Sequence, residues 1–94
     1  MRAIFNGEVI AESDTTVVVE GNHYFPPESV RSEAFTPTEH STHCPWKGDA
    51  SYYTVTVGSE SADNAAWYYP EPEDAAAEIK DHVAFYANLV TIEA

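Results

Sequence analysis

The residues of this chain best suited to chemistry lie together in one short stretch, Cys44-Pro45-Trp46-Lys47-Gly48. It holds the only cysteine, one of two tryptophans and one of the four basic residues. Pro45 fixes φ as the second position of a β-turn requires, and Gly48 accepts a positive φ just after it. Such a turn would bring the Cys44 thiol near the Lys47 ammonium, and a nearby cation stabilises a thiolate. We therefore interpret Cys44 and Lys47 as candidate catalytic residues, either a nucleophile with its activating cation or a polar floor that orients an anion.

A simpler interpretation of the same pair stays open. Free cysteine often behaves as a small hydrophobic residue, so Cys44 could be packed into the turn while Lys47 lies on the surface. On the residues alone this simpler interpretation is the favoured one, and the presence of a cation inside an aromatic segment of a strongly acidic chain shifts the balance slightly toward function.

The segment 50–57, which follows the turn, alternates as a strand does. Side chains of a strand point to its two faces in turn, so Ser51, Tyr53 and Val55 share one face. This face is the more apolar one and is expected to pack on the core. Ser51 would then point inward beside the Cys44 turn, where its hydroxyl needs a ligand or a backbone partner.

Aromatic residues from two other segments complete the predicted site. Tyr24, Trp67 and Tyr69 predict an aromatic-lined pocket for a small molecule, and simple core packing of the same rings is the alternative. His23 is the best histidine partner for Cys44, because neighbouring residues rarely face each other in an extended chain. The predicted ligand-binding residues are therefore His23, Tyr24, Ser51, Trp67 and Tyr69.

A zinc site is the other chemistry that the residue types suggest, with His23, His40, His43 and Cys44 as its ligands. No pair among them has a spacing typical of zinc proteins, and a single cysteine excludes the multi-cysteine zinc knots. Loop histidines are the favoured interpretation. The sequence predicts neither a metal nor a cofactor.

The segment Cys-Pro-Trp-Lys-Gly-Asp-Ala-Ser-Tyr-Tyr at residues 44–53 resembles the signature of the family called domain of unknown function 427. The likeness covers nearly the whole chain, in order, through the further segments 9–13, 24–26, 65–70 and 83–86. It implies a small β-rich domain similar in architecture to the β-tent folds, whose pockets hold small cyclic ligands. The family also carries a nucleotidyltransferase-like label, although the Gly-Ser turn with paired metal-binding carboxylates used by such enzymes is not found here.

The charge of the chain limits its partners. Sixteen acidic residues face four basic ones, for a formal net charge of −12. This charge repels nucleic-acid phosphates and anionic membranes, so neither is predicted as a partner. A small-molecule ligand is expected instead, on a monomer or homodimer. Two explanations of the acidity stay open: an ordinary acidic protein, or adaptation to high salt, where screening relieves the repulsion.

The length and the cysteine count bound the domain and its compartment. The 94 residues are expected to form one domain, 1–94, with a single modest core. No signal peptide follows Met1-Arg2, and no stretch approaches the ~20 apolar residues of a membrane helix. One cysteine excludes an intramolecular disulfide. The sequence therefore predicts a cytoplasmic protein.

The periodicity predicts a mainly β fold, a β-rich α+β class with compact antiparallel sheets of β-tent or sandwich type. Asn6-Gly7 lies between two apolar runs and is a strong hairpin signal, because both turn positions need positive φ. Further turns at 13–14 and 21–22 make residues 2–25 a meander of short strands. Beyond it we expect one helical turn at 26–31, a polar loop at 35–42, a turn or loop at 58–63 and a strand at 64–69.

The C-terminal third predicts one short helix and leaves one alternative. Residues 73–80 have the Ala, Glu and Lys of a helix, with two acids in its first turn. Residues 82–86 and 89–93 are interpreted as a last hairpin because of their valines and aromatics, and an extension of the helix is the competing interpretation.

Two classes of function are compatible with these features. The first is a pocket for a small molecule or an anion at the 44–48 motif, with or without catalysis. The second is a non-catalytic interaction module that presents an acidic surface to another protein.

Overall fold

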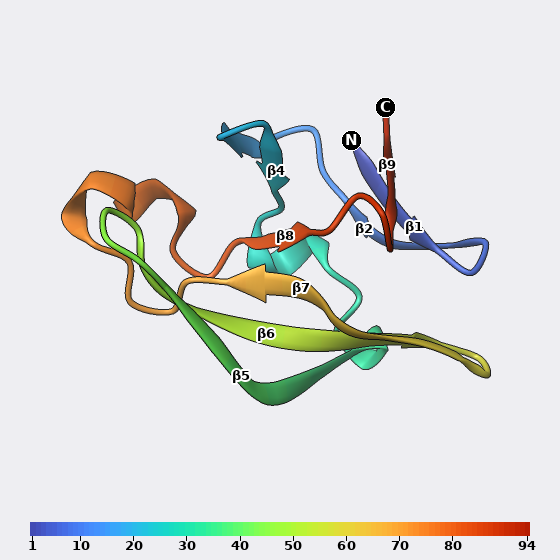
Figure 1. The fold of residues 1–94 in the computed structure, drawn as a ribbon. Coiled ribbons are helices and arrows are strands. Elements are labelled where there is room, and N and C mark those ends of the chain that lie inside the picture. Colours follow the sequence, from blue (N-terminus) through green and yellow to red (C-terminus); the bar gives the residue numbers. More distant parts are fainter.

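Strands dominate the architecture (Figure 1). The computed structural model describes all residues, 1–94, and arranges nine strands in three antiparallel sheets. The strands are β1 (Arg2–Phe5), β2 (Glu8–Glu12), β3 (Val17–Val19), β4 (Asn22–Tyr24), β5 (Phe35–Cys44), β6 (Gly48–Val57), β7 (Glu60–Tyr68), β8 (Val83–Phe85) and β9 (Thr91–Glu93). Three 3-10 segments complete the chain, η1 (Pro27–Ser29), η2 (Ser32–Ala34) and η3 (Asp74–Ile79). The predicted compact, mainly β fold class is confirmed.

The three sheets differ in size and in how they are anchored. The largest has the order β5-β6-β7-β8, and the candidate turn closes its β5–β6 hairpin. The second has the order β2-β1-β9, so the first and last strands of the chain are paired. The third is the two-stranded β3–β4 hairpin, which lies above β8 in Figure 1. A bridge between Phe25 and Val83 ties the hairpin to the largest sheet.

Two tight turns organise the N-terminal meander. Asn6 and Gly7 have φ values of 49° and 78°, which confirms the predicted hairpin turn. The β3–β4 turn uses Glu20 and Gly21, with φ values of 54° and 80°, one residue earlier than predicted. The prediction missed by one because Asn22 is paired with Val19 and is therefore the first residue of β4.

The polar segment 35–42 was expected to be a loop and is instead most of the long strand β5. Its side chains are largely exposed, so it lacks the apolar alternation by which a strand is recognised in a sequence. Pairing of its backbone with β6 makes it a strand. Similarly, the predicted loop at 58–63 shrinks to a turn, because β7 already begins at Glu60.

The C-terminal predictions are right in part. A helical segment forms near the expected place, but it is a 3-10 segment, Asp74–Ile79, with a kink at Ala76. Residues 83–85 and 91–93 are strands and do not extend the helix. They do not form a hairpin either, because β8 pairs with β7 and β9 pairs with β1.

The buried side chains form two clusters. The first, called here the apolar cluster, consists of Ala3, Ile10, Ala11, Phe25, Ala34, Val55, Ala65, Ala66, Val83, Phe85 and Val90. The second, called here the tyrosine cluster, consists of Tyr24, Ala50, Tyr52, Trp67, Tyr69, Ala76, Ile79 and Ala84. Since both clusters receive side chains from β6, β7 and β8, the largest sheet connects them.

The two faces of strand β6 contribute side chains to different clusters. Val55 lies in the apolar cluster and Tyr53 packs against it, so the predicted core face is correct for this half of the strand. Tyr52 and Ala50 point the other way and belong to the tyrosine cluster. The sequence did not indicate this second core face, because Tyr52 stands between polar and aromatic neighbours on a strand whose other face is more apolar.

No helix of the structure has the length and the apolar character that crossing a membrane demands.

Candidate binding site

The turn at the centre of the candidate site is a three-residue hairpin loop. Cys44 pairs with Gly48, which leaves Pro45, Trp46 and Lys47 between the strands. Gly48 has a φ of 109°, and a Cβ at this position would lie 3.3 Å from the backbone oxygen of Glu71. The requirement for glycine is therefore both conformational and steric. This close approach lets the 71–73 segment pack directly on the turn.

A backbone hydrogen bond fixes the position of Lys47. The amide N–H of Glu73 donates to the Lys47 carbonyl at 2.9 Å. Together with the contact at Gly48, this bond holds the turn against the segment that precedes η3. The Lys47 side chain therefore extends from a backbone that is held by these two contacts.

Lys47 is the only charged residue that is buried, with 7% of its surface exposed. Its ammonium forms an ion pair with the carboxylate of Glu20, the first turn residue of the β3–β4 hairpin. The same ammonium lies 5.4 Å from the ring centroid of Trp46 and 5.6 Å from that of Tyr69. These distances fall within the range of cation–π attraction. Lys47 is therefore a buried cation with one anionic partner and two aromatic walls.

The surroundings of this ion pair shift both pKa values so as to favour the charged forms. Burial alone would lower the pKa of Lys47, but the hydrogen bond with Glu20 and the nearby tyrosines outweigh it and raise the pKa above its usual value. The hydrogen bond from Lys47 lowers the pKa of Glu20, against a smaller opposing effect of burial. Both groups are therefore ionised at neutral pH.

The predicted aromatic residues Tyr24, Trp67 and Tyr69 are buried in the tyrosine cluster, and Tyr69 is the one whose ring lies beside the Lys47 ammonium. The indole N–H of Trp67 donates a hydrogen bond of 3.1 Å to the Tyr24 hydroxyl, and the two rings meet edge to face. Burial is the main cause that raises the pKa of Tyr69, and the Lys47 ammonium opposes it. Tyr24 and Cys44 contribute further to the raised pKa of Tyr69.

Cys44 lies in the same region but is not matched to Lys47 as expected. It is a free, half-buried thiol that packs against the tyrosine cluster. The charge of the Lys47 ammonium is compensated by Glu20, which weakens any stabilisation that this cation could give to a thiolate. Glu20 is thus the site residue that sequence reasoning missed. One acid among sixteen gives no local signal, and the pair joins residues 27 positions apart.

Two predicted binding residues lie apart from this group. His23 alternates with Tyr24 on β4, and its Nδ1 is 2.9 Å from the Thr16 hydroxyl. Ser51 is only partly buried and lies on the face of β6 opposite to Ala50, whereas Cys44 shares the Ala50 face. The expectation that Ser51 points inward beside Cys44 is therefore wrong. It failed because the core changes faces along β6.

A second polar group, not predicted, lies on the face of the tyrosine cluster. The hydroxyls of Thr42 and Tyr52 are 2.9 Å apart, and that of Tyr86 lies 3.4 Å from Tyr52. The His40 ring meets the Tyr52 ring at 4.5 Å, and Tyr86 lies 4.7 Å from Trp67. The hydrogen bond with Tyr52, followed by burial, raises the pKa of Tyr86 to about 12.

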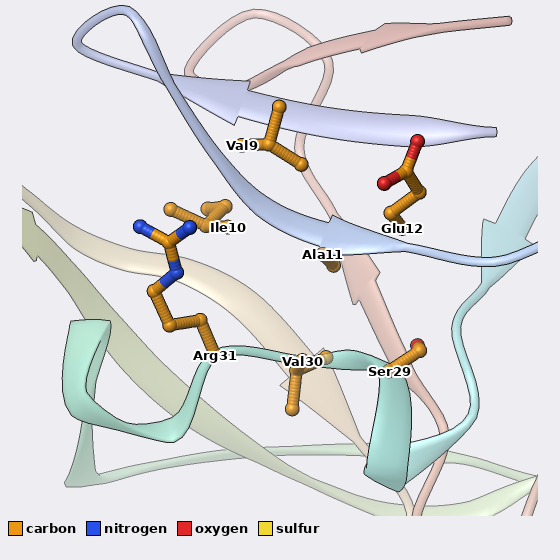
Figure 2. Close-up of a pocket in the computed structure, with 7 residues that line it drawn as sticks. All are labelled: Val9, Ile10, Ala11, Glu12, Ser29, Val30 and Arg31. Carbon is orange, nitrogen blue, oxygen red and sulfur yellow. The ribbon is translucent and has the colours of Figure 1, made fainter.

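The open cavities of the surface lie elsewhere. One groove of about 220 Å³ runs between β2 and the 29–31 segment (Figure 2). Its floor is apolar, and the Arg31 guanidinium lies at the opposite end from Glu12 and Ser29. Two other cavities have volumes of about 380 and 290 Å³. Residues 5–6, 60–62 and 88–89 line the first, and Glu8, Arg31 and residues 33–34 and 56–58 line the second. None of the three contains a predicted site residue, so the surroundings of Lys47 are a filled site.

Candidate metal ligands are scattered. The structure contains no group of three His, Cys, Asp or Glu side chains arranged so that they could hold a metal ion. His40 meets the Tyr52 ring edge to face, and the Nδ1 of His43 is 2.7 Å from the Asp49 carboxylate. These histidines therefore have neighbours of other kinds.

Comparison with known proteins places the chain in a family. A family model described as a domain of unknown function (DUF427) matches residues 1–94. No curated protein matches the chain. The match includes the 44–53 segment, so the turn, its lysine and the strand after it are part of the region that the family model describes. With its whole length matched, this chain belongs to the DUF427 family of domains of unknown function.

Proposed function

We propose that the protein binds a small anionic molecule at Lys47, with the surrounding aromatic rings contacting the apolar body of that molecule. One observation carries the proposal. Lys47 is the single buried cation of a chain with a net charge of −12, and it lies between two aromatic rings with a solvent-accessible carboxylate as its partner. Burying an ammonium is costly even when it is paired, and a buried ion pair is only weak evidence for stability, so we take this lysine as a candidate binding group.

The rings supply a suitable second half of such a site. Trp46 has 40% of its surface exposed directly beside Lys47, and Tyr69 forms the inner wall. An exposed aromatic face next to a buried cation suits a ligand with a flat apolar body and one charged group. His23 and Ser51, which lie apart, are not part of this proposal.

Catalysis at the site stays a prediction that concerns Cys44 and Lys47. Cys44 packs against the tyrosine cluster, so a bound molecule would have a nucleophilic atom in reach only if the thiol faces it. We also propose a reducing, cytoplasmic setting, since the single cysteine is free.

An interaction module is the second candidate, and one observation favours it. Four large hydrophobic residues are exposed, Val18, Trp46, Tyr86 and Leu89. Exposed aromatic residues often anchor protein interfaces. A partner protein of this kind would bury Trp46 and Tyr86 and would leave Lys47 paired with Glu20.

A binding screen with matched variants tests the first proposal. Thermal shift measurements would use a panel of anions, among them aromatic carboxylates, inorganic phosphate and nucleotides, because a ligand that binds only the native state raises its melting temperature. We expect at least one anion to stabilise the wild type and not Lys47→Met. Lys80→Met removes an exposed lysine and serves as the control of equal charge. Stabilisation that survives in Lys47→Met would contradict the proposal.

A further inference from the structure

Glu20 is held in a conformation that its residue type disfavours. Its φ is 54°, in the left-handed region, where a side chain with a Cβ is strained. Turns of this kind favour Asn, Asp or Gly at the same position, and Gly21 already supplies the glycine that follows. Asparagine here would relieve the turn but would not provide a carboxylate. Glutamate at this position therefore adds backbone strain but supplies the carboxylate that pairs with Lys47.

The two partners of the ion pair differ in how they are exposed. The Lys47 side chain is 9% exposed, whereas the Glu20 side chain is 52% exposed. Water and solutes consequently reach the carboxylate far more easily than the ammonium. A molecule that contacts the ammonium has to take the place of at least part of the Glu20 side chain.

The partners also differ in how they are anchored. The Lys47 backbone is held by its hydrogen bond with Glu73 and by the tight packing at the neighbouring Gly48. Glu20 lies at the tip of a sheet of two strands, each three residues long. Small two-stranded hairpins are only marginally stable by themselves. The cation is thus held at the turn of the largest sheet, whereas the anion lies on the exposed turn of a small hairpin.

We propose that Glu20 occupies the subsite of the ligand's own carboxylate and that a small monocarboxylate with a planar apolar body displaces it. This inference rests on the proposed function of Lys47 and specifies its ligand. Glu20 then acts as a built-in competitor, which keeps the buried ammonium paired while no ligand is bound. Displacement replaces one charge-assisted hydrogen bond by another of the same type, so Lys47 never becomes an unpaired buried charge.

The charges favour a monocarboxylate over a phosphate. One ammonium neutralises one negative charge, and a phosphate dianion would leave a second charge in the field of a protein with a net charge of −12. The shape of the site points the same way, because the subsite already accommodates a carboxylate. The rings of Trp46 and Tyr69 offer apolar contact to whatever is attached to it.

Isothermal titration with three probes tests the inference: benzoate, its neutral analogue benzamide, and inorganic phosphate. Glu20→Gln keeps the shape of the competitor and removes its charge. If the ion pair is closed about nine-tenths of the time, its loss tightens benzoate binding about tenfold. Glu39→Gln, an exposed acid outside every ion pair, is the control for net charge and should change the affinity less than about twofold. Benzamide should not bind.

The outcomes separate this inference from the proposed function. If no anion binds the wild type or Glu20→Gln in a Lys47-dependent way, the proposed function fails. If benzoate binding needs Lys47 but is the same in Glu20→Gln and Glu39→Gln, the site exists and the role of Glu20 is wrong. If phosphate gains as much as benzoate, the assignment of a monocarboxylate is wrong.

A measurement on the wild type makes the test independent of how well Glu20→Gln folds. Carbon-13 NMR of the Glu20 carboxyl group reports its pKa, which Lys47 holds below the usual value of 4.5. Saturation with benzoate should return this pKa toward 4.5, because the displaced carboxylate faces water. A Glu20 pKa that stays low while benzoate is bound would overturn the displacement.

Discussion

The apolar cluster and the tyrosine cluster are equally well buried, but their side chains can do very different things. The apolar cluster contains only Ala, Ile, Val and Phe side chains. The tyrosine cluster contains three tyrosines and a tryptophan, and Lys47 lies beside it. No buried side-chain polar atom lacks a hydrogen-bond partner. One face of the large sheet thus carries an ordinary apolar core, and the other carries a core with polar groups kept in fixed positions.

This difference indicates a division of labour within one small domain. Apolar side chains contribute mainly through the area that they remove from water, which is insensitive to pH and salt. Buried hydroxyls and charges contribute through directed bonds that depend on both. Substitutions in the apolar cluster should therefore change stability alone. Substitutions in the tyrosine cluster should change titration and binding as well.

The largest expected effect is a loss of stability in the apolar cluster. Ile10 is fully buried there, and Ile10→Ala should cost about 2–5 kcal/mol of unfolding free energy, measured by urea denaturation. The exposed Leu89 provides the control, since Leu89→Ala should stay within about 0.5 kcal/mol. The anion affinity of folded Ile10→Ala should equal that of the wild type. A weaker affinity in the folded variant would show that the two clusters are coupled.

The next effect concerns the ion pair beside the tyrosine cluster. Glu20→Gln should lower the melting temperature more than Lys47→Met does, because it leaves a buried ammonium without its partner. Lys47→Met leaves an exposed carboxylate that water solvates. Equal melting temperatures would show that the ammonium finds solvent in the variant.

The acid limb of the stability curve checks the same pair. The pKa of Glu20 is lowered in the folded state, so its contribution is present above the usual value of 4.5 and is lost as the pH falls through the lowered value. Lys47→Met should lack this loss, whereas Lys80→Met should keep it. The free energy of unfolding, measured by chemical denaturation at several pH values from about 3 to about 7, gives the difference.

A smaller effect separates two tyrosines, one from each region. Tyr53 packs on the apolar cluster, and burial is the main cause that raises its pKa to about 12. The pKa of Tyr86 is also raised to about 12, but a hydrogen bond with Tyr52 is the main cause. Tyr52→Phe should therefore lower the pKa of Tyr86 and leave that of Tyr53, as measured by the ultraviolet absorbance of the phenolate. Equal changes at both tyrosines would contradict the assignment of causes.

Both raised values predict the direction of alkaline destabilisation. An unfolded tyrosine ionises near pH 10, so above this pH the unfolded state loses its protons first. Stability should be complete below about pH 10 and fall as the pH rises toward about 12. The raised pKa of Lys47 acts in the same direction above its usual value of 10.5.

Salt should produce the smallest effect, through the self-repulsion of the acidic surface. The net charge of −12 makes the folded protein repel itself, so the melting temperature should rise between low salt and molar sodium chloride. A melting temperature that stays flat or falls would show that the acidic side chains are already far enough apart.

The sequence predicted those features that depend on neighbouring residues. The Asn6-Gly7 turn follows from the conformations of two residues, and the sharp turn at Gly48 from one. Strand β5 was missed because its exposed polar side chains show no core face, and only its pairing with β6 defines it. Glu20 was missed for the same reason at a longer distance. Its role depends on Lys47, which tertiary structure alone brings to it.

The pairing of β1 with β9 sets an order for synthesis. Arg2 is synthesised before its strand partner and salt-bridge partner, Glu93, which follows 91 residues later in the chain. At a synthesis rate of about 5–20 residues per second, the edge of β1 that pairs with β9 has no partner for several seconds. The β5–β6–β7 meander needs only nearby segments and can pair during that time. The N-terminal sheet is therefore closed last, although it is made first.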